Sequence, residues 1–126
     1  MSFAGLVAGA QPLDGGFAID VPPDWHQGRT AYGGLSAALA LEAALRAGGD
    51  RLAPPRSATV HFVGPVHGAG EARAKVLRRG GTATWIDAGF YRDDEPVLTA
   101  GFVFMNPVPT ALSLARHPAP QGLIAP

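Results

Sequence analysis

The segment that most constrains this fold is YGGLSAALALEAALRA, residues 32–47. Alanine and leucine fill it, and Glu42 and Arg46 are its only charged residues. A glycine pair at positions 48–49 follows, which is a common way for a helix to end. The segment therefore predicts one long helix. Because the helix is apolar on nearly every side, we expect the rest of the chain to bury it.

Outside this helix, apolar residues recur with the period of two that is typical of strands. In SATVHFV, for example, Ala58, Val60 and Phe62 fall on one face. The predicted strands are residues 17–21 before the helix and residues 57–63, 71–76, 82–91 and 97–104 after it. With hairpin turns such as RDDEP between them, they predict an α+β domain in which a five-stranded antiparallel sheet wraps around one central helix.

The length of the chain, 126 residues, suffices for one domain and is too short for two. We expect a single domain over residues 1–105. Repeated prolines then predict an irregular tail over residues 106–126, in which residues 110–115 are the candidate for a short ordered segment. One sheet and one helix leave sheet edges without cover, which favours a homodimer or a higher homo-oligomer.

Charge and cysteine content exclude several classes of function. The formal net charge is +0, which gives no electrostatic basis for binding nucleic acid or an anionic membrane. The absence of cysteine excludes disulfides, thiolate nucleophiles and cysteine-bound zinc, and no motif predicts a metal site. The first residues lack the basic region of a signal peptide, and no apolar run is long enough to span a membrane. We therefore expect a cytoplasmic protein.

Four short motifs follow one another in a recognisable order. They are the glycine pair Gly33-Gly34 at the helix start, FVGP at 62–65, LRRG at 77–80 and AGFVF at 100–104. Their order and spacing resemble the N-terminal hot-dog unit of the acyl-CoA thioesterase II family, over roughly residues 15–105. The resemblance implies a hot-dog fold, an acyl-CoA as the substrate and no separate cofactor.

The chain departs from that family at the catalytic residues. Members usually carry two hot-dog units, and their catalytic Asp, Thr and Gln lie in the second. The position here that corresponds to the Asp, counted back from Pro65, is Ser57. Hydrolysis of an acyl-CoA thioester is the leading hypothesis. The alternative is a non-catalytic acyl-CoA-binding module, or an accessory half that pairs with another hot-dog chain, and a dehydratase is a weaker third reading.

The amides of Gly33 and Gly34 are the first candidate for chemistry. At a helix N-terminus, their N–H groups can polarise a thioester carbonyl and stabilise the oxyanion that forms on it. Glycine also lets a substrate approach the backbone closely. The alternative explanation for this pair is tight packing of the helix start beneath the sheet.

Three titratable residues near the helix are candidates for the base. His26 and Asp24 lie in the loop before it, and His26 occupies a spacing at which related thioesterases place a polar residue that orients water or substrate. Glu42 lies on the helix, one residue after the position that carries an acid in some single-unit hot-dog thioesterases. One residue rotates a side chain by about 100°. We therefore favour an i,i+4 ion pair between Glu42 and Arg46 over a catalytic role.

Candidate contacts to coenzyme A complete the prediction. Arg78 and Arg79 lie at a turn and suit phosphate groups, although a solvated turn is the more common meaning of such a pair. Tyr32, directly before the glycine pair, is the third candidate.

Overall fold

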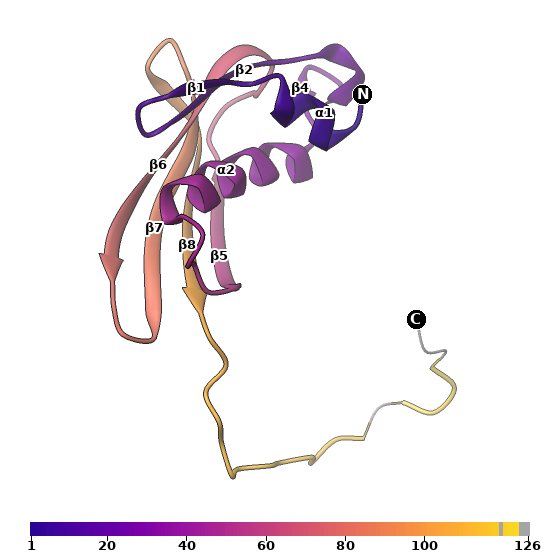
Figure 1. The fold of residues 1–126 in the computed structure, drawn as a ribbon. Coiled ribbons are helices and arrows are strands. Elements are labelled where there is room, and N and C mark those ends of the chain that lie inside the picture. Colours follow the sequence, from indigo (N-terminus) through magenta and orange to yellow (C-terminus); the bar gives the residue numbers. More distant parts are fainter. Residues whose placement is uncertain (119, 124–126) are drawn as a thin grey trace.

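The computed structural model of the chain describes residues 1–118 and 120–123 (Figure 1). Its helices are α1 (Phe3–Ala8) and α2 (Gly33–Gly48), with a 3-10 turn at Pro23–Trp25. Its strands are β1 (Gln11–Leu13), β2 (Gly16–Val21), β3 (His26–Gln27), β4 (Thr30–Ala31), β5 (Pro55–Phe62), β6 (Gly68–Arg79), β7 (Ala83–Arg92) and β8 (Glu95–Met105).

A curved antiparallel sheet holds the long helix against its concave side (Figure 1). The strand order is β1-β2-β6-β7-β8-β5, and α2 packs against β2, β6, β7 and β8. The predicted α+β fold, with one central helix and the strands on either side of it in sequence, is therefore confirmed. The sheet has six strands rather than five, because the short β1 adds to the edge of β2.

The short elements were not predicted from the sequence. Helix α1 has six residues and is capped by Ser2, whose Oγ accepts a hydrogen bond from the Gly5 amide at 3.1 Å. Strands β3 and β4 form a separate two-stranded ladder just before α2. A helix of six residues has fewer than two turns, and a strand of two or three residues is too short to show alternation, so the conformation of these elements depends on the structure around them.

The hairpins follow the predicted turn chemistry. Asp93 and Asp94 have φ angles of 49° and 62°, and Arg92 pairs with Glu95 on either side of them. Two consecutive residues with positive φ form the two-residue turn whose twist matches that of the strands. The predicted turn at RDDEP is thus confirmed.

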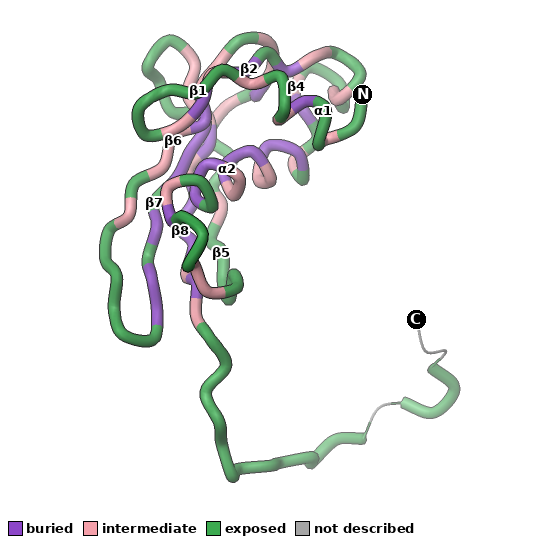
Figure 2. The backbone as a smooth tube through the Cα atoms, viewed as in Figure 1, coloured by how far each residue is buried: buried purple, intermediate pink, exposed green. Residues whose placement is uncertain are grey.

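The core lies between α2 and the concave face of the sheet. Its fully buried side chains are Phe17, Leu39, Ala40, Ala44, Ala72, Phe90, Leu98 and Phe104. Only one stripe of α2 is buried, and buried and half-buried stretches alternate along it in Figure 2. On the opposite flank Leu41 is half-buried and Leu45 is 40% exposed. The expectation that this chain buries the helix all round is therefore wrong, because the sheet covers one side of it.

Beyond Met105 the described residues form no helix or strand, including the candidate segment at 110–115. They are exposed and lead away from the sheet (Figure 1). Residues 119 and 124–126 of the predicted tail lie outside the described residues.

Candidate functional site

The N-terminus of α2 presents two backbone amides without partners. The carbonyl of Tyr32 accepts hydrogen bonds from Leu35 N at 3.0 Å and Ser36 N at 3.2 Å. Within the described part of the chain, no group accepts from the amides of Gly33 and Gly34, and no side chain caps the helix. These N–H groups carry the positive end of the helix dipole. They can therefore bind an electron-rich oxygen.

Two aromatic rings flank these amides. The Phe62 ring lies 3.3 Å from the point where a Cβ at Gly33 would stand, and the Tyr32 ring lies in direct contact with the corresponding point at Gly34. Phe62 is 63% and Tyr32 53% exposed. The rings line the glycine pair and leave it open to solvent. A side chain at Gly34 would displace the Tyr32 ring, and a side chain at Gly33 would press against the Phe62 ring.

A set of hydrogen bonds holds the start of α2 in place. The amide of Ala31 donates to the carbonyl of Val66 at 2.6 Å, and the amide of Val66 donates to Thr30 Oγ1 at 3.0 Å. The amide of Tyr32 donates to the carbonyl of Trp25 at 3.0 Å. The segment before the helix is thus fixed to the loop that follows β5. Sequence reasoning did not find Thr30 or Val66, because their contacts join positions 36 residues apart.

His26 lies on β3 and belongs to a small polar cluster. Its ring meets the ring of His67 edge-on, with centroids 6.4 Å apart, and its Nε2 is buried with no partner among the described residues. Arg92 Nη1 lies 3.0 Å from His67 Nε2. Arginine can only donate, so His67 Nε2 is the acceptor. The sequence predicted His26 as a candidate but gave no signal for His67 or Arg92.

The two candidate acids are engaged elsewhere. Glu42 Oε1 accepts from Arg46 Nε at 2.8 Å, so the predicted i,i+4 ion pair is confirmed. The Arg46 guanidinium in turn lies 4.4 Å from the centre of the Phe17 ring. Asp24 is exposed, and its Oδ2 lies 3.1 Å from the amino group of Met1. No contact in the structure joins either carboxylate to the glycine amides.

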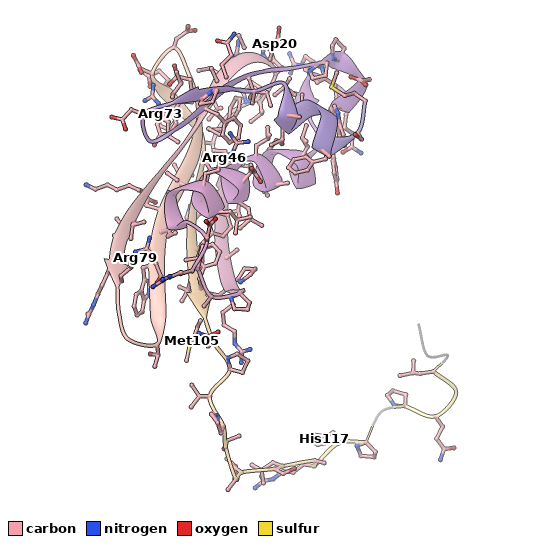
Figure 3. All side chains as sticks on the ribbon, in the orientation of Figure 1. Asp20, Arg46, Arg73, Arg79, Met105 and His117 are labelled. Carbon is pink, nitrogen blue, oxygen red and sulfur yellow. The ribbon has the colours of Figure 1, made fainter. Side chains whose placement is uncertain are left out.

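The two candidate arginines lie at the other end of α2. Arg79 Nη2 donates to the carbonyl of Gly48 at 2.7 Å, and Figure 3 shows Arg79 near this end of the helix. Arg78 is exposed, with its guanidinium 6.0 Å from the centre of the Trp85 ring. At 1.5 Å per residue, a 16-residue helix separates its ends by about 22 Å. Within one chain, the structure therefore does not bring these arginines to the glycine pair.

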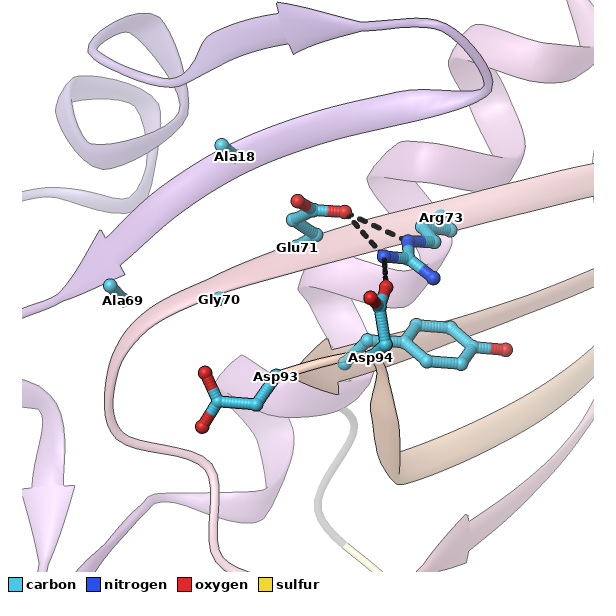
Figure 4. Close-up of a pocket in the computed structure, with 8 residues that line it drawn as sticks. Ala18, Ala69, Gly70, Glu71, Arg73, Asp93 and Asp94 are labelled. Atoms are coloured by element: carbon cyan, nitrogen blue, oxygen red, sulfur yellow. Dashed lines mark hydrogen bonds and ion pairs between the residues drawn. The ribbon is translucent and has the colours of Figure 1, made fainter.

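Two of the hollows in the surface are lined by residues other than the glycine pair. One, of about 310 Å³, lies on the face of the sheet away from α2, where Arg73 bonds to Glu71 and Asp94 (Figure 4). The hydrogen bond to Asp94, followed by that to Glu71, raises the pKa of Arg73 above its usual value. The other, of about 250 Å³, lies between the open flank of α2 and β5 and is lined by Leu41, Pro55, Arg56, Ser57, Ala58 and Phe102.

Neither a metal centre nor a membrane span is visible in residues 1–118 and 120–123. No three histidine or acidic side chains gather there in a way that could hold a metal ion. None of the helices in this part of the chain has both the length and the apolar character to cross a bilayer.

Solved structures share this fold. A protein from Thermobifida fusca, named as a candidate thioesterase II, is 23% identical with a TM-score of 0.75, covering 98% of this chain and 46% of its own. A hot-dog protein from Alicyclobacillus acidocaldarius is 21% identical with a TM-score of 0.73, covering 97% and 47%. A Bacillus halodurans protein solved with CoA is 20% identical with a TM-score of 0.62, covering 72% and 66%. The fold is therefore a hot-dog fold, and the chain spans about half the length of the first two relatives.

The sequence itself gives the family. No curated protein matches it. The acyl-CoA thioesterase N-terminal domain family matches residues 21–105, which is well over half of the chain and includes α2 and strands β5 to β8. The chain belongs to the family of acyl-CoA thioesterase N-terminal domains.

Proposed function

We propose that this domain binds an acyl-CoA thioester, with the carbonyl oxygen on the amides of Gly33 and Gly34, and takes part in its hydrolysis. The observation that carries the proposal is the pair of unpartnered amides at the solvent-open start of α2. The family supports a thioesterase-like function, and the similar fold of a protein solved with CoA supports CoA as the carrier.

The chemistry follows from the helix terminus. Two N–H groups that are fixed at a helix terminus and have no partner cost little reorganisation when negative charge develops on the carbonyl oxygen, and losing one such donor lowers the rate by about 10²–10³. We propose His26 as the first candidate for the base, because its Nε2 has no partner among the described residues. Asp24 comes second. Glu42 comes last, since it is bonded to Arg46.

A second hot-dog unit is part of the proposal. Strand β5 pairs with β8 on one side only, and all of its residues except Val60 are exposed. The apolar hollow beside Leu41 continues this open surface onto the flank of α2. A second copy of the chain that pairs with β5 would cover both. Arg78 is then the better of the two arginines to bind the phosphates of CoA, because Arg79 is occupied by Gly48.

The absence of an acid at position 57 and the surroundings of Glu42 and Asp24 favour a second function, a non-catalytic acyl-CoA-binding half. Position 57 carries a serine in place of an acid, Glu42 is ion-paired and Asp24 is exposed. In that case the amides bind the carbonyl and another hot-dog chain supplies the base.

Thiol release from short, long and aromatic acyl-CoAs tests the two functions. A thioesterase releases thiol above background, and His26→Ala lowers kcat/KM at least tenfold. His117→Ala serves as the control, because His117 lies in the exposed tail (Figure 3). Binding of acyl-CoA without turnover would identify the accessory half, and neither binding nor turnover would contradict both functions.

A further inference from the structure

The side chain of Tyr32 lies against the glycine pair, and its hydroxyl is free. The phenol oxygen and the ring contact the point where a Cβ of Gly34 would stand. Within the described residues the hydroxyl has no hydrogen-bond partner, and the side chain is 53% exposed. Among side-chain donors, this O–H is the one that the structure places directly at Gly34.

We propose that the Tyr32 hydroxyl is the third donor to the thioester carbonyl, beside the amides of Gly33 and Gly34. This inference rests on the proposed function and names a catalytic residue for it. Tyrosine hydroxyls supply such hydrogen bonds in other oxyanion sites, where they act together with backbone N–H groups. The backbone of Tyr32 has a separate task, since its carbonyl accepts from Leu35 and Ser36.

The glycine at position 34 makes this arrangement possible. Any side chain there would occupy the space of the Tyr32 ring and push the hydroxyl away from the helix start. On the other side, the Phe62 ring lies beside Gly33 and offers apolar surface without a donor. Three neutral donors and an apolar wall suit a neutral carbonyl that lies between a methylene group and a sulfur atom, as in a thioester.

The reaction places charge where these donors lie. The oxygen of a water molecule attacks the carbonyl carbon and gives its proton to the base, and the electron pair of the C=O bond moves to the oxygen. Tyr32 donates its hydrogen bond to that oxygen and keeps its proton. The electron pair then re-forms the C=O bond, the C–S bond breaks, and the CoA thiolate takes the proton from the base. The products are the carboxylic acid and CoA.

The experiment compares Tyr32→Phe with Tyr91→Phe. Each variant removes one hydroxyl and keeps the ring, and Tyr91 lies on the other face of the sheet, over Arg73. Calorimetry measures the Kd of two acyl-CoA analogues that are not hydrolysed. In the first, a methylene replaces the sulfur and the carbonyl remains. The second is an S-alkyl-CoA, which has no carbonyl.

We expect Tyr32→Phe to weaken binding of the carbonyl analogue about tenfold, the factor that corresponds to one net hydrogen bond. Binding of the S-alkyl analogue should change less than twofold, and Tyr91→Phe should change neither. Where turnover is measurable, Tyr32→Phe should lower kcat/KM by about 10²–10³. Matching circular dichroism spectra would exclude unfolding as the cause.

Two results would overturn the inference in different ways. If Tyr32→Phe binds both analogues as the native chain does, Tyr32 is not a donor, while the proposed function stands. If the native chain binds neither analogue, the proposed function fails, and the role of Tyr32 fails with it.

Discussion

Arg78 and Arg79 are adjacent, yet the fold gives them different surroundings. Arg79 Nη2 donates to the carbonyl of Gly48, one of the last carbonyls of α2, which lack partners within the helix. Arg78 points elsewhere, and its guanidinium lies at 6.0 Å from the Trp85 ring. Arg79 thus joins the end of β6 to the end of the central helix, a role that a pair of arginines in a turn motif does not reveal.

Removing the Arg79 side chain should therefore cost stability. We expect Arg79→Ala to lower the free energy of unfolding by about 1 kcal/mol, because a charge-assisted bond to a helix C-terminus is lost. Arg78→Ala should stay within about 0.5 kcal/mol, as is usual for exposed positions. Urea unfolding followed by circular dichroism compares the two. Equal losses would show that the Gly48 contact contributes nothing.

Among contacts between single residues, sequence reasoning succeeded where the two partners are close in the sequence. The ion pair of Glu42 and Arg46 follows from helical spacing alone. His67 and Arg92 lie 25 residues apart in the sequence. They meet because the start of β6, which follows His67, lies beside the end of β7, which carries Arg92. The contact of Phe62 with Gly33 is likewise a product of the fold. The sequence therefore named Gly33, Gly34, Tyr32 and His26 as candidates, but it gave no sign of Phe62, His67 or Arg92.

At the scale of elements, the helix and strands whose apolar residues recur over several positions were predicted from the sequence. The short elements α1, β1, β3 and β4, which depend on contacts with the rest of the fold, were not. The helix and the four later strands are each at least eight residues long, and β2 shows its alternation over residues 17–21. Strand β1 has three residues and contains Pro12, so it depends on its pairing with β2. Strand β2 in turn approaches β6 very closely at Gly16, where a Cβ would collide with the Ala72 carbonyl oxygen.

This close approach predicts a sharp difference between two glycines in strands. Gly16→Ala should lower the free energy of unfolding by about 1–3 kcal/mol, because the obstacle is backbone of β6 and cannot turn aside. Gly101→Ala on β8 meets open space, and the gain in strand propensity should leave stability equal or higher by about 0.5 kcal/mol. Thermal and urea unfolding measure both. A neutral Gly16→Ala would mean that β2 lies farther from β6.

At the scale of the whole molecule, one side of α2 and the edge of β5 are not covered by the residues that the structure describes. On this flank of α2, Leu41 is half-buried and Leu45 is 40% exposed, and Leu41 lines the apolar hollow together with residues of β5. The sequence predicted a helix that needs cover on all sides, and one sheet supplies it on one side only. Half of the length of the first two relatives has no counterpart in this chain. We infer that a second hot-dog unit covers this side of the fold.

We expect the native chain to sediment as a dimer. A lysine on the concave face of β5 should dissociate this dimer into monomers. Ala58 is exposed there and pairs with Phe102, so Ala58→Lys places an ammonium group in the apolar hollow. An unpaired charge buried between copies costs several kcal/mol, which is enough to dissociate a dimer at micromolar concentration.

Ala69→Lys is the control, since Ala69 is exposed beside Asp20 on β2. Analytical ultracentrifugation should give a monomer for the first variant and a dimer for the second. A native monomer at every concentration, or an Ala58→Lys dimer, would show that β5 and the open flank of α2 do not hold a second copy.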